Sequence, residues 1–368
     1  MASPRRLEAR AVPAVRTINH GVLRGFLAAV FQASGSSPEE ATMVADHLVD
    51  ANLKGHDSHG AIRAAKYVEW VRAGQLVPNR HAQVLSDRAS LVTVDGGFGY
   101  GQVIGREAMA IAAGRARESG LCAIAIRNSG HLGRIGAWAE QLADAGLVSV
   151  HFVNTSGFGI LVAPHGGSDR RLSANPIAAG TPVAGSAPLI LDIATSTIAE
   201  GKIQIARNRG EALEPGIVID GKGRPTTDPD AFYAEPPGAI FPFGGHKGSG
   251  LSVFCEILAG SLTGGRSSYP HNATAGRLVN NMLSVALDPT AFPDNDFAAD
   301  VARLAAWTRA SPPIEPTGEV LLPGEIEART ARERLRDGVP FDRESIRQLT
   351  GAASRLGVSV PSELEVTP

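Results

Sequence analysis

The sequence predicts an α/β fold in which a core of strands and helices carries a helical unit at the two ends of the chain. Apolar strand-like segments alternate with amphipathic helical segments through residues 91–154, a pattern typical of α/β cores. Residues 19–73 and 325–356 show helical periodicity instead. The glycine-rich loop after the first strand is not a Rossmann loop, because Ile104 occupies its third glycine position.

The helical unit begins with a helix expected over residues 19–33. The second helix has a clear start signal, since Ser37 is a typical N-cap and Pro38 suits the first helical position. Gly55 ends this helix. A third helix is expected over 60–73.

The core is predicted as strands joined by helices. The first part of the core has strands over 91–95, 121–126 and 147–154, with helices over 104–118 and 135–145. The later segments are strands over 189–193 and 282–287, an amphipathic helix over 248–262, and two polar helices over 325–336 and 343–356. Together they give an α/β core between helical ends.

Composition and charge exclude several classes of protein. The 368 residues carry a formal net charge of −2, and their lysines and arginines are scattered, so we expect no nucleic-acid partner. No apolar run reaches the roughly 18 residues of a membrane span, so we expect no membrane partner. Cys122 and Cys255 lie in apolar runs, which is typical of a reducing compartment and predicts a cytoplasmic protein.

The segment around His59 carries residues suited to an anionic substrate. A helix beginning near Ser58 would bring His59, Arg63 and Tyr67, spaced by four, onto one stripe. Arginine can bind a carboxylate through two parallel hydrogen bonds. Histidine can exchange a proton near neutral pH.

Two other interpretations of this segment stay open. Its polar residues could form a solvated helix face that contains a histidine by chance. Alternatively His56 and His59, spaced i, i+3, could act with His131 in a metal-dependent lyase or hydrolase. A single HxxH pair is a weak metal signal, and we expect no metal site.

His131 follows a strand and precedes a helix, within Asn128-Ser129-Gly130-His131. This pattern predicts a histidine at a helix N-terminus, where the helix dipole disfavours the protonated imidazole. Such a histidine suits a proton acceptor. An ordinary strand-to-helix turn is the alternative.

A second glycine-rich segment, 244–250, surrounds Lys247 just before an amphipathic helix. Free amide N–H groups, a helix N-terminus and an ammonium group together can bind an anion such as a pyrophosphate. The segment is not a Walker A loop, because its lysine lacks the required spacing.

The chain resembles the malate/L-lactate dehydrogenase family of the non-Rossmann type, from about Val15 to its C-terminus. Members include ureidoglycolate and sulfolactate dehydrogenases, 2,3-diketogulonate reductases and piperideine-2-carboxylate reductases. The resemblance rests on the order of six motifs: DSHGAIRAAKYVEWVRAGQLVP, VDGGFGYGQVIGREAM, RNSGHLGRIGAWAEQLADAG, NPIAAGTP, LDIATSTIAEGKI and GGHKGSGL.

The resemblance implies a largely antiparallel, non-Rossmann cofactor-binding sheet with a helical domain from both chain ends. It implies a homodimer whose active site is completed across the subunit interface, and NAD or NADP as cofactor. The domains expected on this basis are a flexible extension at 1–15, a helical substrate and dimer domain at 16–85 with 325–368, and a cofactor domain at 86–324 with a small helical insertion around 200–265.

The resemblance also assigns roles to single residues. His59 and His131 correspond to histidines given the acid/base role in different members, and Asp192 to a carboxylate near the nicotinamide. The substrate-binding residues are expected to be Ser58, Arg63, Tyr67 and Ser156. The expected cofactor contacts are Thr155, Pro188, Leu189, Ile190, Leu191, Asp192, Ile193, Ala194, His246, Lys247, Gly324, Glu325 and Ile326.

These observations predict an oxidoreductase that transfers a hydride between NAD(P)H and a small 2-oxo or 2-hydroxy acid, or a cyclic imino acid. We favour His131 as the proton acceptor in alcohol oxidation, because a helix N-terminus would keep it neutral. His59, held by Asp192, is the alternative. The sequence does not choose among malate, lactate, ureidoglycolate and sulfolactate, or between NAD and NADP.

Overall fold

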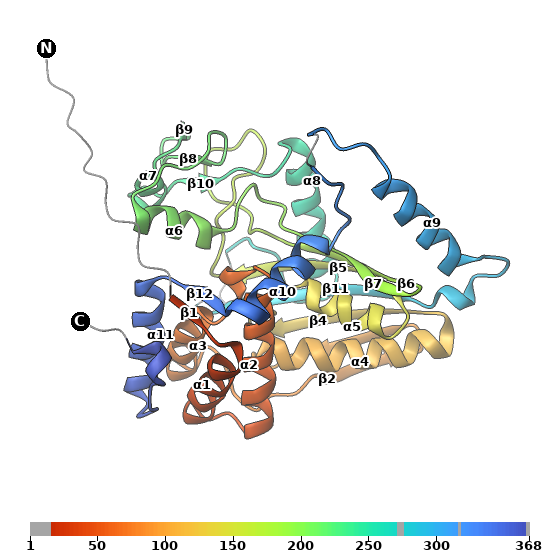
Figure 1. The fold of residues 1–368 in the computed structure, drawn as a ribbon, viewed down its shortest axis with the longest axis horizontal. Helices are drawn as coiled ribbons and strands as arrows, with labels where there is room; N and C mark the ends of the chain where they lie inside the picture. Colours follow the sequence, from red (N-terminus) through yellow and green to blue (C-terminus); the bar gives the residue numbers. More distant parts are fainter. Residues whose placement is uncertain (1–15, 271–275, 316–317, 366–368) are drawn as a thin grey trace, which may run out of the picture.

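The computed structural model describes residues 16–270, 276–315 and 318–365 (Figure 1). The extension expected over residues 1–15 lies outside the described residues. The described chain is a mixed α/β structure, which confirms the predicted fold class. None of its described helices combines the length and the apolar character needed to cross a bilayer.

A seven-stranded sheet forms the centre of the molecule, with strand order β2-β3-β4-β11-β5-β6-β7. Its strands are β2 (Gln83–Arg88), β3 (Leu91–Asp95), β4 (Leu121–Ser129), β5 (Val148–Gly157), β6 (Ile177–Val183), β7 (Ser186–Ile193) and β11 (Leu278–Leu287). Only β3 and β4 run parallel, and every other neighbouring pair is antiparallel. The largely antiparallel, non-Rossmann sheet is therefore confirmed.

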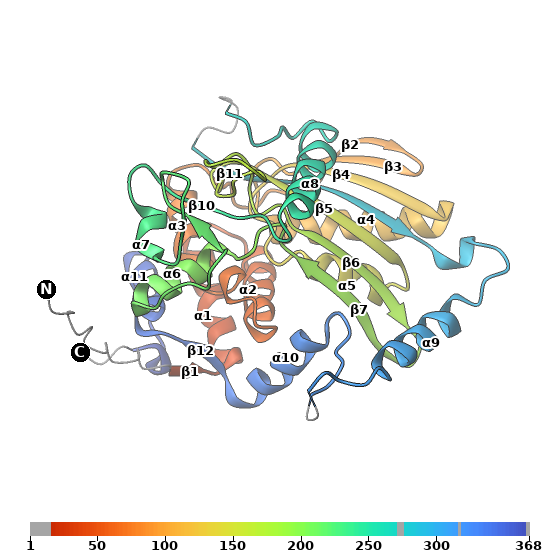
Figure 2. The same cartoon turned by 90° about the horizontal axis from the view of Figure 1, so that it is seen from above.

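Helices cover both faces of this sheet (Figures 1 and 2). On one face α4 (Gly101–Ser119) and α5 (Gly136–Asp144) bury apolar side chains against the strands, in a core that includes Ile104, Met109 and Trp138. On the other face lies α8 (His246–Cys255), which continues as a π-helix over Glu256–Ser261.

Both ends of the chain build one helical unit. Its helices are α1 (His20–Ala33), α2 (Pro38–Leu53), α3 (Arg63–Arg72) and α11 (Arg343–Arg355), with α10 (Glu325–Asp337) beside α2. Strand β1 (Arg16–Ile18) pairs with β12 (Val339–Phe341), and the two chain ends share one hydrophobic core. The expected N-cap is confirmed, because Ser37 Oγ accepts a hydrogen bond from Glu40 N.

The segment expected as a helical insertion around 200–265 is not purely helical. It contains α6 (Glu200–Arg209) and α7 (Pro229–Tyr233), but also a three-stranded sheet of β8 (Val218–Ile219), β9 (Pro225–Thr226) and β10 (Ala239–Ile240). A small core that includes Phe232 and Val218 lies between these elements. Helix α9 (Phe297–Arg309) follows β11.

Two helices differ from the sequence prediction. The third helix begins at Arg63 rather than at residue 60, and a separate 3-10 turn covers Asp57–His59. The helix expected over 248–262 changes from α to π after Cys255, and its apolar residues do not form one buried stripe. Phe254 and Leu262 are exposed instead.

Candidate functional site

Three side chains from distant parts of the chain form one hydrogen-bonded chain. His131 lies after β4, Tyr67 lies on α3, and His59 lies in the 3-10 turn before α3. Tyr67 Oη is 2.6 Å from His131 Nδ1, and His131 Nε2 is 3.3 Å from His59 Nδ1. The two imidazole rings are parallel within 1°. The structure therefore brings the two candidate acid/base groups into direct contact.

The loop that carries Ser58 and His59 is held by buried polar groups. Asn52, at the end of α2, accepts from Ala61 N at 2.7 Å and donates to Asp57 at 2.6 Å. A side chain at Gly60 would overlap Asn52, since a Cβ there would lie 2.3 Å from its amide oxygen. The guanidinium of Arg334 on α10 donates two hydrogen bonds to the Asp57 carboxylate, a rigid pairing.

The loop that carries His131 is fixed from two sides. Asn280 on β11 accepts from Leu132 N at 2.9 Å, and His47 on α2 accepts from Arg134 N at 3.0 Å. The Arg134 guanidinium is almost fully buried and pairs with the carboxylates of Asp50 and Glu140. His131 is therefore presented by a loop that is bonded to the sheet and to the helical unit.

His131 does not lie at a helix N-terminus, which corrects the sequence prediction. Helix α5 begins only at Gly136, because the intervening residues bond to His47 and Asn280 instead of continuing a helix. Burial, and next the charge of Arg63, lower the pKa of His131 well below its usual value. The same two causes lower the pKa of His59. Both imidazoles are thus neutral at pH 7, through burial rather than through a helix dipole.

Arg63 is the cation of this site. It is the first residue of α3, and its Nε donates to Ser58 O at 2.5 Å. Within the described residues no carboxylate forms an ion pair with Arg63, whereas Arg134 and Arg334 are both paired. The Arg63 guanidinium therefore retains the capacity to bind an anion close to the two histidines.

Asp192 does not hold His59, which is a second correction. Its carboxylate on β7 accepts from Gly136 N at 2.8 Å, at the start of α5, whereas His59 bonds to His131. Burial raises the pKa of Asp192. The aspartate thus links β7 to the helix that follows the His131 loop.

The buried histidines make stability dependent on pH. Burial lowers the pKa of His47 and of His151 to about 3, against 6.5 when exposed. Below pH 6.5 these two histidines are protonated in the unfolded chain but remain neutral in the folded chain. The free energy of unfolding should therefore fall as the pH drops below 6.5. Each such group contributes up to about 1.4 kcal/mol per pH unit.

Urea unfolding at several pH values between 7 and 5 measures this slope. The His151 ring hydrogen-bonds to Ser149 and Ser284 and to no candidate site residue within the described residues, so His151→Gln is a suitable comparison. We expect the plot of unfolding free energy against pH to be less steep for the variant than for the wild type, by about 1.4 kcal/mol per pH unit. Equal slopes in the two proteins would contradict the assignment.

The segments expected to contact a cofactor lie along β7. Gly324 packs against Ile190, and Ile190 N donates to Pro323 O at 3.2 Å. At the other end of β7, Phe243 N donates to Thr195 O at 3.0 Å, which places the α8 N-terminus there. Lys247 and its neighbour His246 are exposed at this N-terminus, and His246 also contacts the ring of His165. The remaining members of this set are Pro188, Leu189, Leu191, Ile193 and Ala194 on or beside β7, and Glu325 and Ile326 at the start of α10.

Thr155 and Ser156 lie on β5, within the sheet. Asn280 donates to Thr155 Oγ1 at 3.0 Å, and the same asparagine bonds to the His131 loop. Ser156 Oγ is buried without a hydrogen-bond partner among the described residues. Thr155 is therefore linked to the His131 loop through Asn280.

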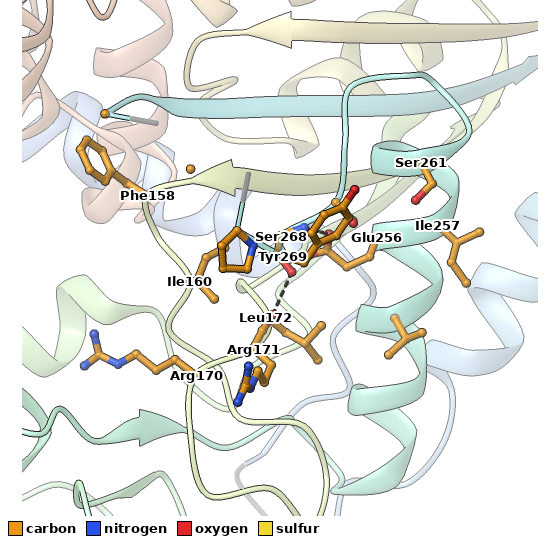
Figure 3. Close-up of a pocket in the computed structure, with 15 residues that line it drawn as sticks. Phe158, Ile160, Arg170, Arg171, Leu172, Glu256, Ile257, Ser261, Ser268 and Tyr269 are labelled. Carbon is orange, nitrogen blue, oxygen red and sulfur yellow. Dashed lines mark hydrogen bonds between the residues drawn. The ribbon is translucent and has the colours of Figure 1, made fainter. Parts of the chain in front are cut away.

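Two cavities flank these elements. One, of about 180 Å³, is lined by residues of β7, α9 and α10 that include Pro188, Leu189, Gly324 and Glu325. The other, of about 830 Å³, lies between α8 with its π-helix and the segment after β5 (Figure 3). Its lining includes Ile257, Tyr269 and Arg171, and none of the expected site residues.

The three histidines of the metal hypothesis do not form a metal site. His56 lies 3.4 Å from Glu327 on α10, whereas His59 and His131 bond to each other. Across the described ranges, no group of three or more His, Cys, Asp or Glu side chains is arranged to bind a metal.

Comparison with known proteins places the chain in a family. Residues 18–350 match the family described as malate/L-lactate dehydrogenase. Hydroxycarboxylate dehydrogenase B of Escherichia coli strain K12 is 41% identical over 338 residues, which cover 91% of this chain and 93% of that protein. The chain belongs to the malate/L-lactate dehydrogenase family. It is therefore an oxidoreductase, and the comparisons give the lyase or hydrolase alternative no support.

Solved structures of this family share the whole fold. The sulfolactate dehydrogenase of Methanocaldococcus jannaschii superposes with a TM-score of 0.83 at 31% identity, over 93% of this chain and 98% of that one. The Δ1-piperideine-2-carboxylate reductase of Pseudomonas syringae gives a TM-score of 0.81 at 31% identity, over 92% and 100% of the chains.

Several residues that support the candidate site were not predicted from the sequence. Gln102, Asn52, Asn280 and Arg134 all bond to the loops or side chains described above. A signal was present for two of them: Asn52 and Gln102 are polar residues within buried helical stretches. A polar residue on a buried face needs a partner, and here the partners belong to the site.

Proposed function

We propose that this member of the malate/L-lactate dehydrogenase family transfers a hydride between NAD or NADP and a small 2-oxo or 2-hydroxy acid. The observation that carries the proposal is the guanidinium of Arg63, which forms no ion pair with a described carboxylate, beside the hydrogen-bonded imidazoles of His59 and His131. A carboxylate and an adjacent carbonyl or hydroxyl group are the two features that this pair can recognise.

The residues along β7 fit a dinucleotide cofactor. Gly324 allows close approach to the backbone of Ile190, where a Cβ would lie 3.3 Å from the amide nitrogen. The cavity of about 180 Å³ beside Pro188 and Glu325 suits one part of a dinucleotide rather than the whole. Exposed Lys247, at the N-terminus of α8, offers a cation and helix amides to a pyrophosphate. When bound, the nicotinamide ring supplies or accepts the hydride.

The chain's own residues bind the substrate and move the proton. Arg63 binds the substrate carboxylate and so fixes the orientation of the adjacent carbon. The contact between His131 Nε2 and His59 Nδ1, at 3.3 Å, is the longest in the chain of hydrogen bonds. A substrate oxygen can replace it and bond to His131 Nε2. In reduction His131 gives its Nε2 proton to the substrate oxygen while Tyr67 passes its phenolic proton to Nδ1, 2.6 Å away, and in oxidation both transfers reverse.

A screen of 2-oxo acids with NADH and with NADPH tests this function. It should include pyruvate, oxaloacetate, sulfopyruvate and a cyclic imino acid, since the family contains sulfolactate dehydrogenases and a piperideine-2-carboxylate reductase. We expect oxidation of one reduced cofactor with at least one of these acids, read at the nicotinamide absorbance band. Turnover of the corresponding aldehydes without a carboxylate, at equal rates, would contradict the proposed role of Arg63.

We further propose that two copies of the chain associate through α8 and its π-helix, rather than through the helical domain at 16–85 with 325–368. This face exposes a set of large apolar side chains, namely Leu251, Val253, Phe254, Ile257 and Leu262. Exposed apolar groups of this size on adjacent turns are typical of an interface. The cavity in Figure 3 borders the same face, through Val253 and Ile257.

Phe254→Glu should convert the proposed dimer to a monomer. Phe254 is 60% exposed in the single chain, and a buried glutamate in each copy would strongly disfavour association. Light scattering after size-exclusion chromatography measures the mass. Leu85→Glu, on the exposed edge strand β2, is the control and should leave the mass unchanged. A dimeric Phe254→Glu protein would contradict this interface.

The two cysteines are consistent with a cytoplasmic location, which we also propose. Cys122 and Cys255 are buried and form no disulfide, as is usual in a reducing compartment.

A further inference from the structure

Gln102 is a buried side chain that extends the hydrogen-bonded chain beyond Tyr67. It is the second residue of α4 and is 2% exposed. Its amide Nε2 donates to Tyr67 Oη at 3.0 Å. The complete chain thus runs from Gln102 through Tyr67 and His131 to His59.

The Gln102 amide group, at one end of this chain, sets the direction of the hydrogen bonds that follow. An amide nitrogen can only donate, so Tyr67 Oη accepts from Gln102. The single phenolic proton of Tyr67 then points to His131 Nδ1, 2.6 Å away, because Tyr67 Oη has no other hydrogen-bond acceptor among the described residues. A neutral imidazole has one N–H, so the proton of His131 lies on Nε2, where it faces His59 Nδ1.

The orientation of the Gln102 amide is favoured by its surroundings. Its oxygen, Oε1, is buried and has no hydrogen-bond partner among the described residues. The reverse orientation would place the NH₂ group, with two donors, in that position. A buried donor without a partner is less well tolerated than a carbonyl oxygen without one. The amide nitrogen therefore faces Tyr67.

We propose that Gln102 is a positioning residue, which acts through Tyr67 to keep the proton of His131 on Nε2. This inference rests on the proposed function, in which His131 Nε2 exchanges a proton with the substrate oxygen. The resting enzyme then presents a proton donor to a substrate carbonyl. Without Gln102, Tyr67 can either donate to or accept from His131, and both forms of the neutral imidazole become populated.

The ¹⁵N spectrum of histidine-labelled protein, without cofactor or substrate, tests this inference. The His131 signals are identified by their loss in His131→Asn. We expect the wild-type protein to show an unprotonated Nδ1 and a protonated Nε2 at His131. The Gln102→Met variant, similar in length but without a donor, should show both forms. A protonated Nδ1 in the wild-type spectrum, or an unchanged spectrum in Gln102→Met, would overturn the proposal.

Kinetics provide the second measurement. We expect Gln102→Met to lower kcat for reduction about five-fold, the usual effect of one neutral hydrogen bond, with little change in KM because Arg63 is intact. Gln348→Met on the exposed face of α11 is the control and should match the wild type. A raised KM with unchanged kcat would show that Gln102 has only a structural role. The wild-type spectrum is informative even if Gln102→Met does not fold or the substrate screen fails, so the two proposals can be rejected separately.

Discussion

Arg63→Met is expected to lower kcat/KM for 2-oxo acids by about 30-fold to about 4,000-fold, which corresponds to the loss of a charged hydrogen-bonded pair of about 2–5 kcal/mol. Arg63 lies beside both histidines, and none of the described carboxylates forms an ion pair with it. Methionine keeps the length of the side chain but cannot bind a carboxylate. Steady-state rates over a range of substrate concentrations measure the effect.

The control for Arg63→Met lies on the same helix. Arg72 is exposed at the end of α3, so Arg72→Met removes the same charge at a distance from the histidines. We expect wild-type kinetics for this variant. If both substitutions lower kcat/KM by the same small factor, the effect comes from the overall positive charge of the protein. Arg63 then does not bind the substrate.

His131→Ala should show the second large effect. Removal of a positioned general acid or base typically costs about a hundred-fold to ten-thousand-fold in rate. Both nitrogens of His131 are engaged in the hydrogen-bonded chain, and its loop is bonded to β11 and α2. Single-turnover oxidation of bound NADH or NADPH isolates the chemical step from product release.

His59→Ala is the comparison that separates the two histidines. If His131 exchanges the proton with the substrate, His59→Ala should be affected less than His131→Ala. The opposite order would assign the proton transfer to His59. Wild-type rates across the pH range in His131→Ala would remove His131 from the mechanism altogether.

The alternation of strands and helices could be read from the sequence because each element buries one face and so repeats its apolar residues at a fixed spacing. Strand β2 lacks this signal, since most of its residues are exposed at the sheet edge. The antiparallel strand order was expected only from the family resemblance. Spacing cannot show that β11, late in the chain, pairs between β4 and β5.

The candidate site was partly predictable for the same reason. Residues such as His59, Arg63 and Tyr67 are close in sequence. They also lie close together in the structure, although His59 is in a 3-10 turn rather than on α3. The position of Asp192 was not predictable, because it depends on a bond to Gly136, 56 residues earlier. Gln102 was missed because its partner, Tyr67, belongs to a different helix.

The bond between Asp57 and Arg334 joins residues 277 positions apart. During synthesis, the turn that carries His59 emerges from the ribosome long before the residue that fixes it. The turn therefore lacks this support until α10 has been synthesised. Premature termination before α10 should yield a polypeptide with a well-paired sheet but no competent catalyst.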